Sequence, residues 1–208
     1  MRPTHGGYHF AVLDDPNPNG ISGPGGFVFV TRGALALARN EDEVAAILAH
    51  EIAHVARKHG EKVIKKTREW QDEVSKMKAL ADADLAAAAR KAKECNLCAE
   101  FARLLGGSAK TFVKTLDKEG YGKDFEFEAD WEGSIYLCEV GYRSSALAEY
   151  LAIMPNREAA TWTTHPSPID RIDSLRPLIV RHCFPEDETK AGIDARNARF
   201  GAVSAKMK

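Results

Sequence analysis

The segment Asn40–His59, NEDEVAAILAHEIAHVARKH, is the stretch that best predicts how this chain folds. Asn40 is a favourable residue for capping the start of a helix, and Glu43 stands where its capping-box partner would be expected. Apolar residues then recur at the three- and four-residue spacing of an amphipathic helix: Val44, Ile47, Leu48, Ile52 and Val55. We predict one long helix that ends near His59 and Gly60.

The middle of this helix carries His50-Glu51-Ile52-Ala53-His54, an HExxH motif. Residues four apart lie one above the other on one helical face, so His50 and His54 can bind one metal ion. Glu51 is turned by about 100° from His50 and borders the same site. There it can take a proton from a metal-activated water and pass it to the leaving amine. A surface helix with paired His and Glu side chains is the alternative at this point.

A third ligand is expected, because a catalytic zinc ion usually has three protein ligands and one open position. The best candidates lie in Asp124–Asp130, DFEFEAD. Glu126 and Asp130 share a helical face, so one can bind the metal while the other accepts the spare N–H of a metal-bound histidine. Glu128 lies roughly opposite, and we expect it to be exposed or engaged elsewhere. The alternative is an acidic first turn favoured by the helix dipole.

A substrate-binding segment is suggested by the glycines and apolar residues before Thr31. Gly25, Gly26, Phe27 and Val28 could form a sheet edge beside the metal, to which an extended polypeptide adds as a further strand. An ordinary core hairpin is the alternative for this segment.

One more histidine and one arginine could complete the site. His165 precedes a strong helix start, Ser167-Pro168, in which serine caps and proline takes the first helical position. His165 could polarise the oxyanion or approach the metal, and Arg171 in that helix could brace the site through a carboxylate. A lone histidine before a helix is more often structural, so this role for His165 depends on the rest of the site.

The remaining sequence indicates an α+β, mostly helical chain with a small N-terminal β-hairpin or sheet. Strands are expected at 8–13 and 27–31 with a turn at 14–20 between them, and helices at about 33–38, 124–139 and 144–153. The 208 residues suit a single domain. We expect an Ala/Lys/Glu-rich helical insertion at about 61–118, through which the chain could form oligomers, and a loosely ordered tail at 186–208.

Composition excludes several classes of partner. The net charge of −1 gives no reason to expect nucleic acid, and no apolar run approaches the roughly 20 residues that span a bilayer. No signal peptide is visible, and the abrupt start leads us to expect that any signal or anchor is absent from this chain. The four cysteines are too few for a disulfide scaffold. We interpret them as buried or incidental thiols, with a disulfide, redox or metal role left open for Cys95 and Cys98.

Four blocks together resemble the HtpX-like and CAAX prenyl endopeptidase family of gluzincin metallopeptidases. They are Asn19–Leu37, Asn40–His59, Glu126–Asp130 and His165–Ile172. The resemblance implies a zincin-like metallopeptidase fold and one zinc ion. It also implies these roles: His50, His54 and Glu126 bind the metal, Glu51 is the general base, Asp130 supports a ligand histidine, and His165 and Arg171 lie near the cleft.

The same resemblance implies a zinc endopeptidase that hydrolyses extended or misfolded polypeptides in protein quality control. Soluble members resemble proteases of the periplasm or cell envelope, which would be the location expected here. Membrane members carry spanning helices around the motif, and this chain lacks them. Two alternatives are a zinc-bearing, chaperone-like module that binds clients without efficient cleavage, and a latent protease closed by the insertion or by His165.

Overall fold

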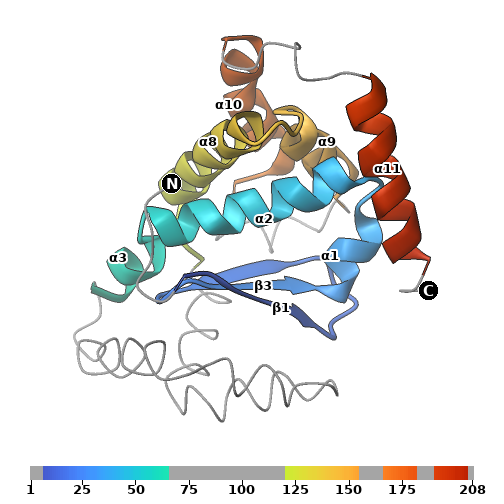
Figure 1. Cartoon of the computed structure of the whole chain (residues 1–208). Coiled ribbons are helices and arrows are strands. Elements are labelled where there is room, and N and C mark those ends of the chain that lie inside the picture. Colours follow the sequence, from blue (N-terminus) through green and yellow to red (C-terminus); the bar gives the residue numbers. More distant parts are fainter. Residues whose placement is uncertain (1–6, 66–119, 155–165, 182–189, 206–208) are drawn as a thin grey trace.

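The computed structural model describes residues 7–65, 120–154, 166–181 and 190–205. The predicted insertion lies almost wholly outside the described residues. Within them the chain is α+β and mostly helical, as predicted. One long helix lies on a small sheet, and further helices cover that helix from its other side (Figure 1).

The sheet has three strands in the order β1-β3-β2: β1 is His9–Leu13, β2 is Gly20–Gly23 and β3 is Phe27–Thr31. β1 pairs parallel to β3, whereas β2 pairs antiparallel to it. The sequence analysis predicted no strand at 20–23, because GISG offers little strand propensity with a glycine at each end. The hairpin is therefore β2–β3, and the predicted strands at 8–13 and 27–31 are parallel neighbours.

The helices lie close to their predicted positions. Their bounds are α1 Arg32–Leu37, α2 Glu41–Ala56, α3 His59–Lys65, α8 Lys123–Glu139, α9 Ala146–Ile153, α10 Pro168–Arg181 and α11 Lys190–Ser204. The Asn40 side chain accepts a hydrogen bond from the N–H of Glu43, which confirms the predicted N-cap of α2. The Glu43 carboxylate instead accepts from the backbone of Arg39, so the capping box is not completed. Ser167 caps α10 as predicted, accepting from the N–H of Asp170.

The predicted end of the long helix near His59 is wrong by about one turn. α2 ends at Ala56, and Lys58 then takes a left-handed backbone conformation with φ of 57°. That conformation is uncommon for a residue other than glycine, and it breaks the helical path. A separate short helix, α3, begins at His59.

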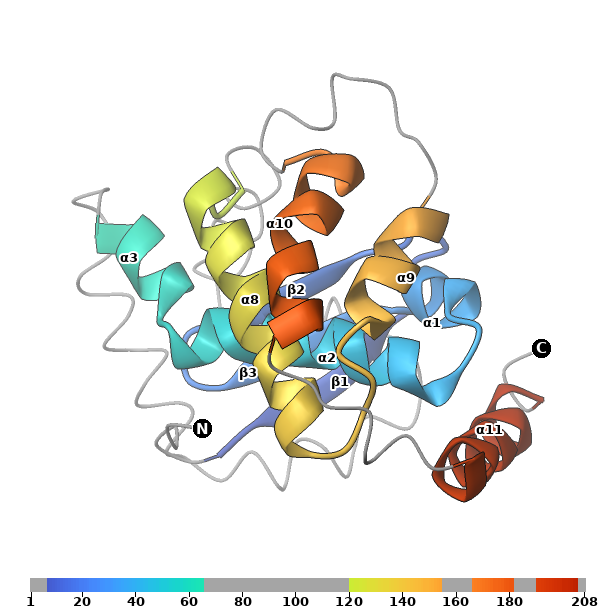
Figure 2. The ribbon, with the colours of Figure 1, turned by 90° about the horizontal axis from the view of Figure 1, so that it is seen from above.

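Helix α2 is buried on two sides. Ile47 packs with Val30 on the sheet side. Small residues lie on the other side of α2, which is the side that α8, α9 and α10 cover (Figure 2). Helix α8 approaches α2 closely because small residues lie on both sides of the contact. In α8 the contact is made at Gly133, where an added Cβ would lie 3.0 Å from the backbone nitrogen of His50. This close crossing places the acidic first turns of α8 beside the HExxH motif.

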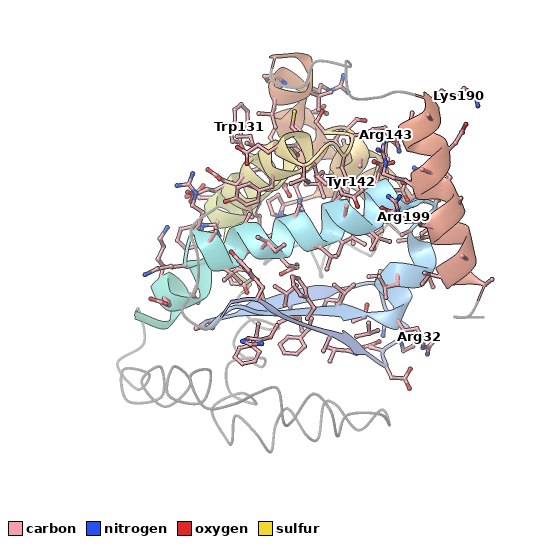
Figure 3. The ribbon with its side chains drawn as sticks, viewed as in Figure 1. Arg32, Trp131, Tyr142, Arg143, Lys190 and Arg199 are labelled. Carbon is pink, nitrogen blue, oxygen red and sulfur yellow. The ribbon has the colours of Figure 1, made fainter. Side chains whose placement is uncertain are left out.

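The segment 186–208, which we expected to be a loosely ordered tail, contains a helix within its described residues. Lys190–Ser204 forms α11, which packs beside the start of α2 (Figure 3). Arg199 makes an ion pair with Glu41 at 2.7 Å, and Arg196 pairs with Asp42 at 3.0 Å. Charged groups at the N-terminus of α2 thus hold the C-terminal helix.

Two further observations complete the fold. None of the helices in the described ranges is long and apolar enough to cross a membrane. Cys138, near the end of α8, takes part in a disulfide bond, so this thiol is not incidental.

Candidate metal centre and active site

Helices α2 and α8 bring the three predicted ligands together. The Nε2 atoms of His50 and His54 lie 3.1 Å apart. The Glu126 carboxylate lies 3.7 Å from His50 Nε2 through Oε2 and 3.5 Å from His54 Nε2 through Oε1. Ligand atoms held about 2.1 Å from a tetrahedral zinc ion are about 3.4 Å apart. The observed spacing fits a single ion, and all three ligand atoms lie within 4.8 Å of one another.

The burial of these side chains also fits a metal. His50, His54 and Glu126 are 8%, 2% and 1% exposed. Two imidazoles and a carboxylate are a donor set that zinc accepts readily. Beside them, Glu51 Oε2 is buried and has no hydrogen-bond partner among the described residues. Such a buried carboxylate oxygen is costly unless something polar binds there, as a reacting water would.

Asp130 and Arg171 support His50 from behind, as the sequence predicted. Asp130 Oδ1 lies 2.8 Å from His50 Nδ1, so the ring donates through Nδ1 and keeps Nε2 for the metal. Arg171 donates two hydrogen bonds to Asp130, at 2.8 and 2.6 Å. Burial alone would raise the pKa of Asp130, but the Arg171 charge and these hydrogen bonds hold it below its usual value. Asp130 therefore stays ionised.

Glu51 lies between the ligands and strand β2. A Cβ on Gly20 would come within 2.4 Å of Glu51 Oε1, so only glycine leaves room for the carboxylate there. Burial raises the pKa of Glu51, while His50 and a hydrogen bond from Ser22 oppose the rise. A carboxylate with a raised pKa has a greater affinity for a proton, which suits a general base.

The two motif histidines differ in their pKa values. Burial lowers the pKa of His54 well below its usual value, and His50 acts in the same direction. Burial and Arg171 also act to lower the pKa of His50, but Asp130 and Glu126 outweigh them and raise it. His54 is therefore the more firmly neutral of the two imidazoles, which is the form that binds a metal.

Tyr121 is a site residue that the sequence analysis missed. Its ring stacks on His54 with 3.9 Å between centroids. Its hydroxyl donates to the backbone carbonyl of Ser22 in β2 at 2.5 Å. The residue thereby links His54 to the sheet. A single tyrosine before a predicted helix carries no signal that could have identified it.

The contact of His59 with His54 and Glu128 was missed as well. His59 is fully buried, with Nδ1 2.9 Å from His54 Nδ1 and Nε2 3.1 Å from Glu128 Oε2. Glu128 is therefore engaged elsewhere than in the metal ligand set, as its place on the helix predicted. The spacing of a continuous helix points His59 away from His54, so no sequence pattern indicated this contact.

Two other predictions have different outcomes. His165 lies outside the described residues, so its role stays a prediction. The segment Gly25–Val28 does not form a sheet edge, because β3 pairs on both sides and Val28 is fully buried. Gly25 and Gly26 form the turn between β2 and β3, both with positive φ. The edge strand nearest Glu51 is β2.

Comparison with known proteins now settles the family, since residues 1–179 match peptidase family M48. The chain belongs to peptidase family M48. Membership confirms the predicted class of protein, a metalloprotease with a zincin-like fold.

Three relatives extend this picture. Over 211 residues the chain is 27% identical to a Vibrio cholerae serotype O1 protein named "Putative beta-barrel assembly-enhancing protease", covering 95% of this chain and 41% of that protein. Over 57 residues it is 47% identical to the mitochondrial metalloendopeptidase OMA1 of Schizosaccharomyces pombe, covering 27% of this chain and 17% of the relative. The Saccharomyces cerevisiae OMA1 is 42% identical over 50 residues, covering 23% and 14%. The M48 chain thus spans less than half the length of these relatives.

Proposed function

We propose that this M48 chain is a zinc-dependent endopeptidase that hydrolyses peptide bonds in extended or misfolded polypeptides. The observation that carries the proposal is the convergence of His50, His54 and Glu126 beside the buried carboxylate of Glu51. A structural zinc site usually closes with a fourth protein ligand, whereas three ligands beside a carboxylate favour a catalytic one.

Zinc bound by these three residues would supply a Lewis acid for the attacking water and the scissile carbonyl. The other tasks fall to the protein. Glu51 accepts a proton from the attacking water and donates it to the leaving amine, for which its raised pKa is suited. Asp130 and Arg171 hold His50 in orientation. His165 remains our candidate for stabilising the oxyanion.

The substrate is proposed to pair with β2 rather than with Gly25–Val28. Thr31 donates its N–H to the Asn19 carbonyl, which makes Asn19–Thr31 a hydrogen-bonded pair in the register of β2 and β3. Antiparallel pairs alternate, so the N–H and C=O groups of Gly20 and the N–H of Ser22 point away from β3 and could pair with a peptide. The Ser22 carbonyl on the same edge already accepts a hydrogen bond from the Tyr121 hydroxyl. An extended peptide joined to this edge would pass beside Glu51, and backbone pairing gives binding largely independent of sequence.

Glu51→Gln tests the proposed function. The amide keeps the shape of the side chain but cannot accept the proton. We expect casein cleavage to fall by roughly 10²-fold to 10⁴-fold while zinc stays bound at one ion per chain. Glu139→Gln, the same change at an exposed position of α8, is the matched control and should cleave like the wild type. A chelator should abolish cleavage, and added zinc should restore it.

Two outcomes would contradict the proposal. If the purified chain binds no zinc, the metal site is wrong. If the wild type binds zinc and unfolded casein without cutting it, and Glu51→Gln binds casein equally well, the chain is a client-binding module.

A further inference from the structure

His59 is a buried titratable side chain that the proposed reaction does not use. It is 0% exposed and lies between the HExxH helix and α8. Its ring stacks on Phe125 with 4.5 Å between centroids and 13° between planes. It also contacts the ring of His54 edge-on at 4.9 Å. A histidine enclosed in this way has a single orientation.

The backbone is shaped so that this contact can form. On a continuous helix His59 would be rotated by about 140° from His54, too far around the axis to touch it. The left-handed Lys58 ends that path and starts α3 in a new direction. The strained residue thus brings the His59 ring under the ring of His54.

The hydrogen bonds around His59 determine where each proton lies. When His54 Nε2 binds a metal, its Nδ1 carries the hydrogen. His59 Nδ1, 2.9 Å away, must then be an acceptor. The His59 proton is therefore on Nε2, from which it donates to Glu128 Oε2 at 3.1 Å. The hydrogen bonds therefore run in one direction, from the His54 ring to the His59 ring and from there to the Glu128 carboxylate.

His50 and His54 each donate a hydrogen bond from Nδ1 to a supporting side chain, but the supporting side chains differ. His50 donates directly to the carboxylate of Asp130. His54 donates to the neutral imidazole of His59. That ring in turn donates to the carboxylate of Glu128, whose side chain is 36% exposed. Hydrogen bonds in a chain polarise one another, so the outer carboxylate can act on the ligand through the intervening ring.

We propose that His59 and Glu128 are positioning residues for the zinc ligand His54, holding its tautomer and ring orientation through a carboxylate–imidazole–imidazole relay. This inference rests on the proposed zinc site. Loss of such an outer partner typically lowers metal affinity by about 10-fold to 100-fold. Of these two residues, His59 contacts His54 directly and should account for most of the effect on metal affinity. The charge of Glu128, which acts through His59, contributes a smaller part.

Zinc affinity of the full 208-residue chain tests the relay, measured by competition with a chromophoric chelator. We expect His59→Leu to weaken zinc binding by about 10-fold to 100-fold and Glu128→Gln by severalfold. Glu132→Gln is the matched control: Glu132 lies one turn further along α8 and, like Glu128, pairs with Arg57. The control should bind zinc as tightly as the wild type. Circular dichroism and thermal unfolding of each variant check that it folds.

Nitrogen-15 NMR of the zinc-loaded wild type tests the tautomers without any substitution. We expect His59 protonated at Nε2 and His54 at Nδ1. A His59 proton on Nδ1 would overturn the relay, as would a folded His59→Leu variant with wild-type zinc affinity. If His59→Leu does not fold, Glu128→Gln and the NMR result decide. A wild type that binds no zinc refutes the proposed function itself, whereas unchanged variants of a zinc-binding wild type refute only the relay.

Discussion

His50 and His54 stand one helical turn apart in α2, yet their surroundings differ. His50 is supported by an ionised carboxylate, Asp130, that is itself held by the buried cation of Arg171. His54 is supported by the neutral ring of His59 and covered by the ring of Tyr121. The same ligand type is thus held by charge on one side and by neutral rings on the other.

This difference indicates how much each support contributes to the stability of the fold. Asp130 is 0% and Arg171 7% exposed, so removing one charge leaves the other buried without its partner. The support of His54 ends in the partly exposed carboxylate of Glu128, which water can solvate when a partner is lost. We therefore expect substitutions in the support of His50 to lower the free energy of unfolding. Substitutions in the support of His54 should mainly lower the affinity for the metal.

Asp130→Asn is the substitution with the largest expected effect. It leaves the Arg171 guanidinium buried beside an amide, with the Glu126 carboxylate 3.7 Å away. Breaking a buried pair in this way typically costs about 3–5 kcal/mol. Urea unfolding of the metal-free chain measures the loss. Glu128→Gln is the comparison from the His54 side and should cost less than about 1 kcal/mol. Equal losses in the two variants would contradict the proposed difference.

Acidification of the metal-free chain should protonate His50 before His54. The pKa of His50 is raised above the usual value for histidine and that of His54 is lowered below it, so the first ring takes up its proton at a higher pH than the second. By linkage, His50 contributes stability below about pH 6.5, and this contribution is lost as the pH rises through its folded pKa. His54 has the opposite sign: it lowers stability as the pH falls below about 6.5, where the unfolded chain binds its proton.

NMR titration of the two rings measures this order directly. Asp130→Asn should shift the His50 titration to lower pH, because it removes the carboxylate that favours the charged ring. The prediction is wrong if His54 takes up its proton first.

Tyr121→Phe has the smallest expected effect. It deletes the hydroxyl that donates to the Ser22 carbonyl but keeps the ring over His54. The loss of one buried hydrogen bond predicts a decrease of about 1 kcal/mol in the free energy of unfolding. Zinc affinity should stay within about twofold of the wild type. A tenfold weaker affinity would show that the link to β2, and not the ring alone, supports His54.

Much of the fold could be predicted from periodicity and local signals. The cap at Asn40, the apolar spacing of α2 and the Ser167-Pro168 start of α10 are all local properties of the chain, and the structure confirms them. Strand order could not be predicted in this way. The GISG segment of β2 lacks strand propensity, and it becomes a strand because it pairs with β3 and packs beside α2.

The candidate site also has features that local sequence patterns predicted and features that they did not. The helical spacing of His50 and His54, and of Glu126 and Asp130, predicted which side chains could converge. The predicted sheet edge at Gly25–Val28 was wrong, because nothing in the sequence tells a central strand from an edge strand. Tyr121 was missed because it reaches the site through long-range contacts alone.

The sequence by itself determined which side chains could act together in this M48 chain, because the spacing of two imidazoles and a carboxylate on one helix follows from helix geometry alone. Tertiary structure decided how each ligand is supported. The close crossing of α2 and α8 at Gly133 brings Glu126 and Asp130 to the motif. The left-handed turn at Lys58 places His59 against His54. Both depend on how separate helices pack, and packing depends on contacts between residues far apart in the chain.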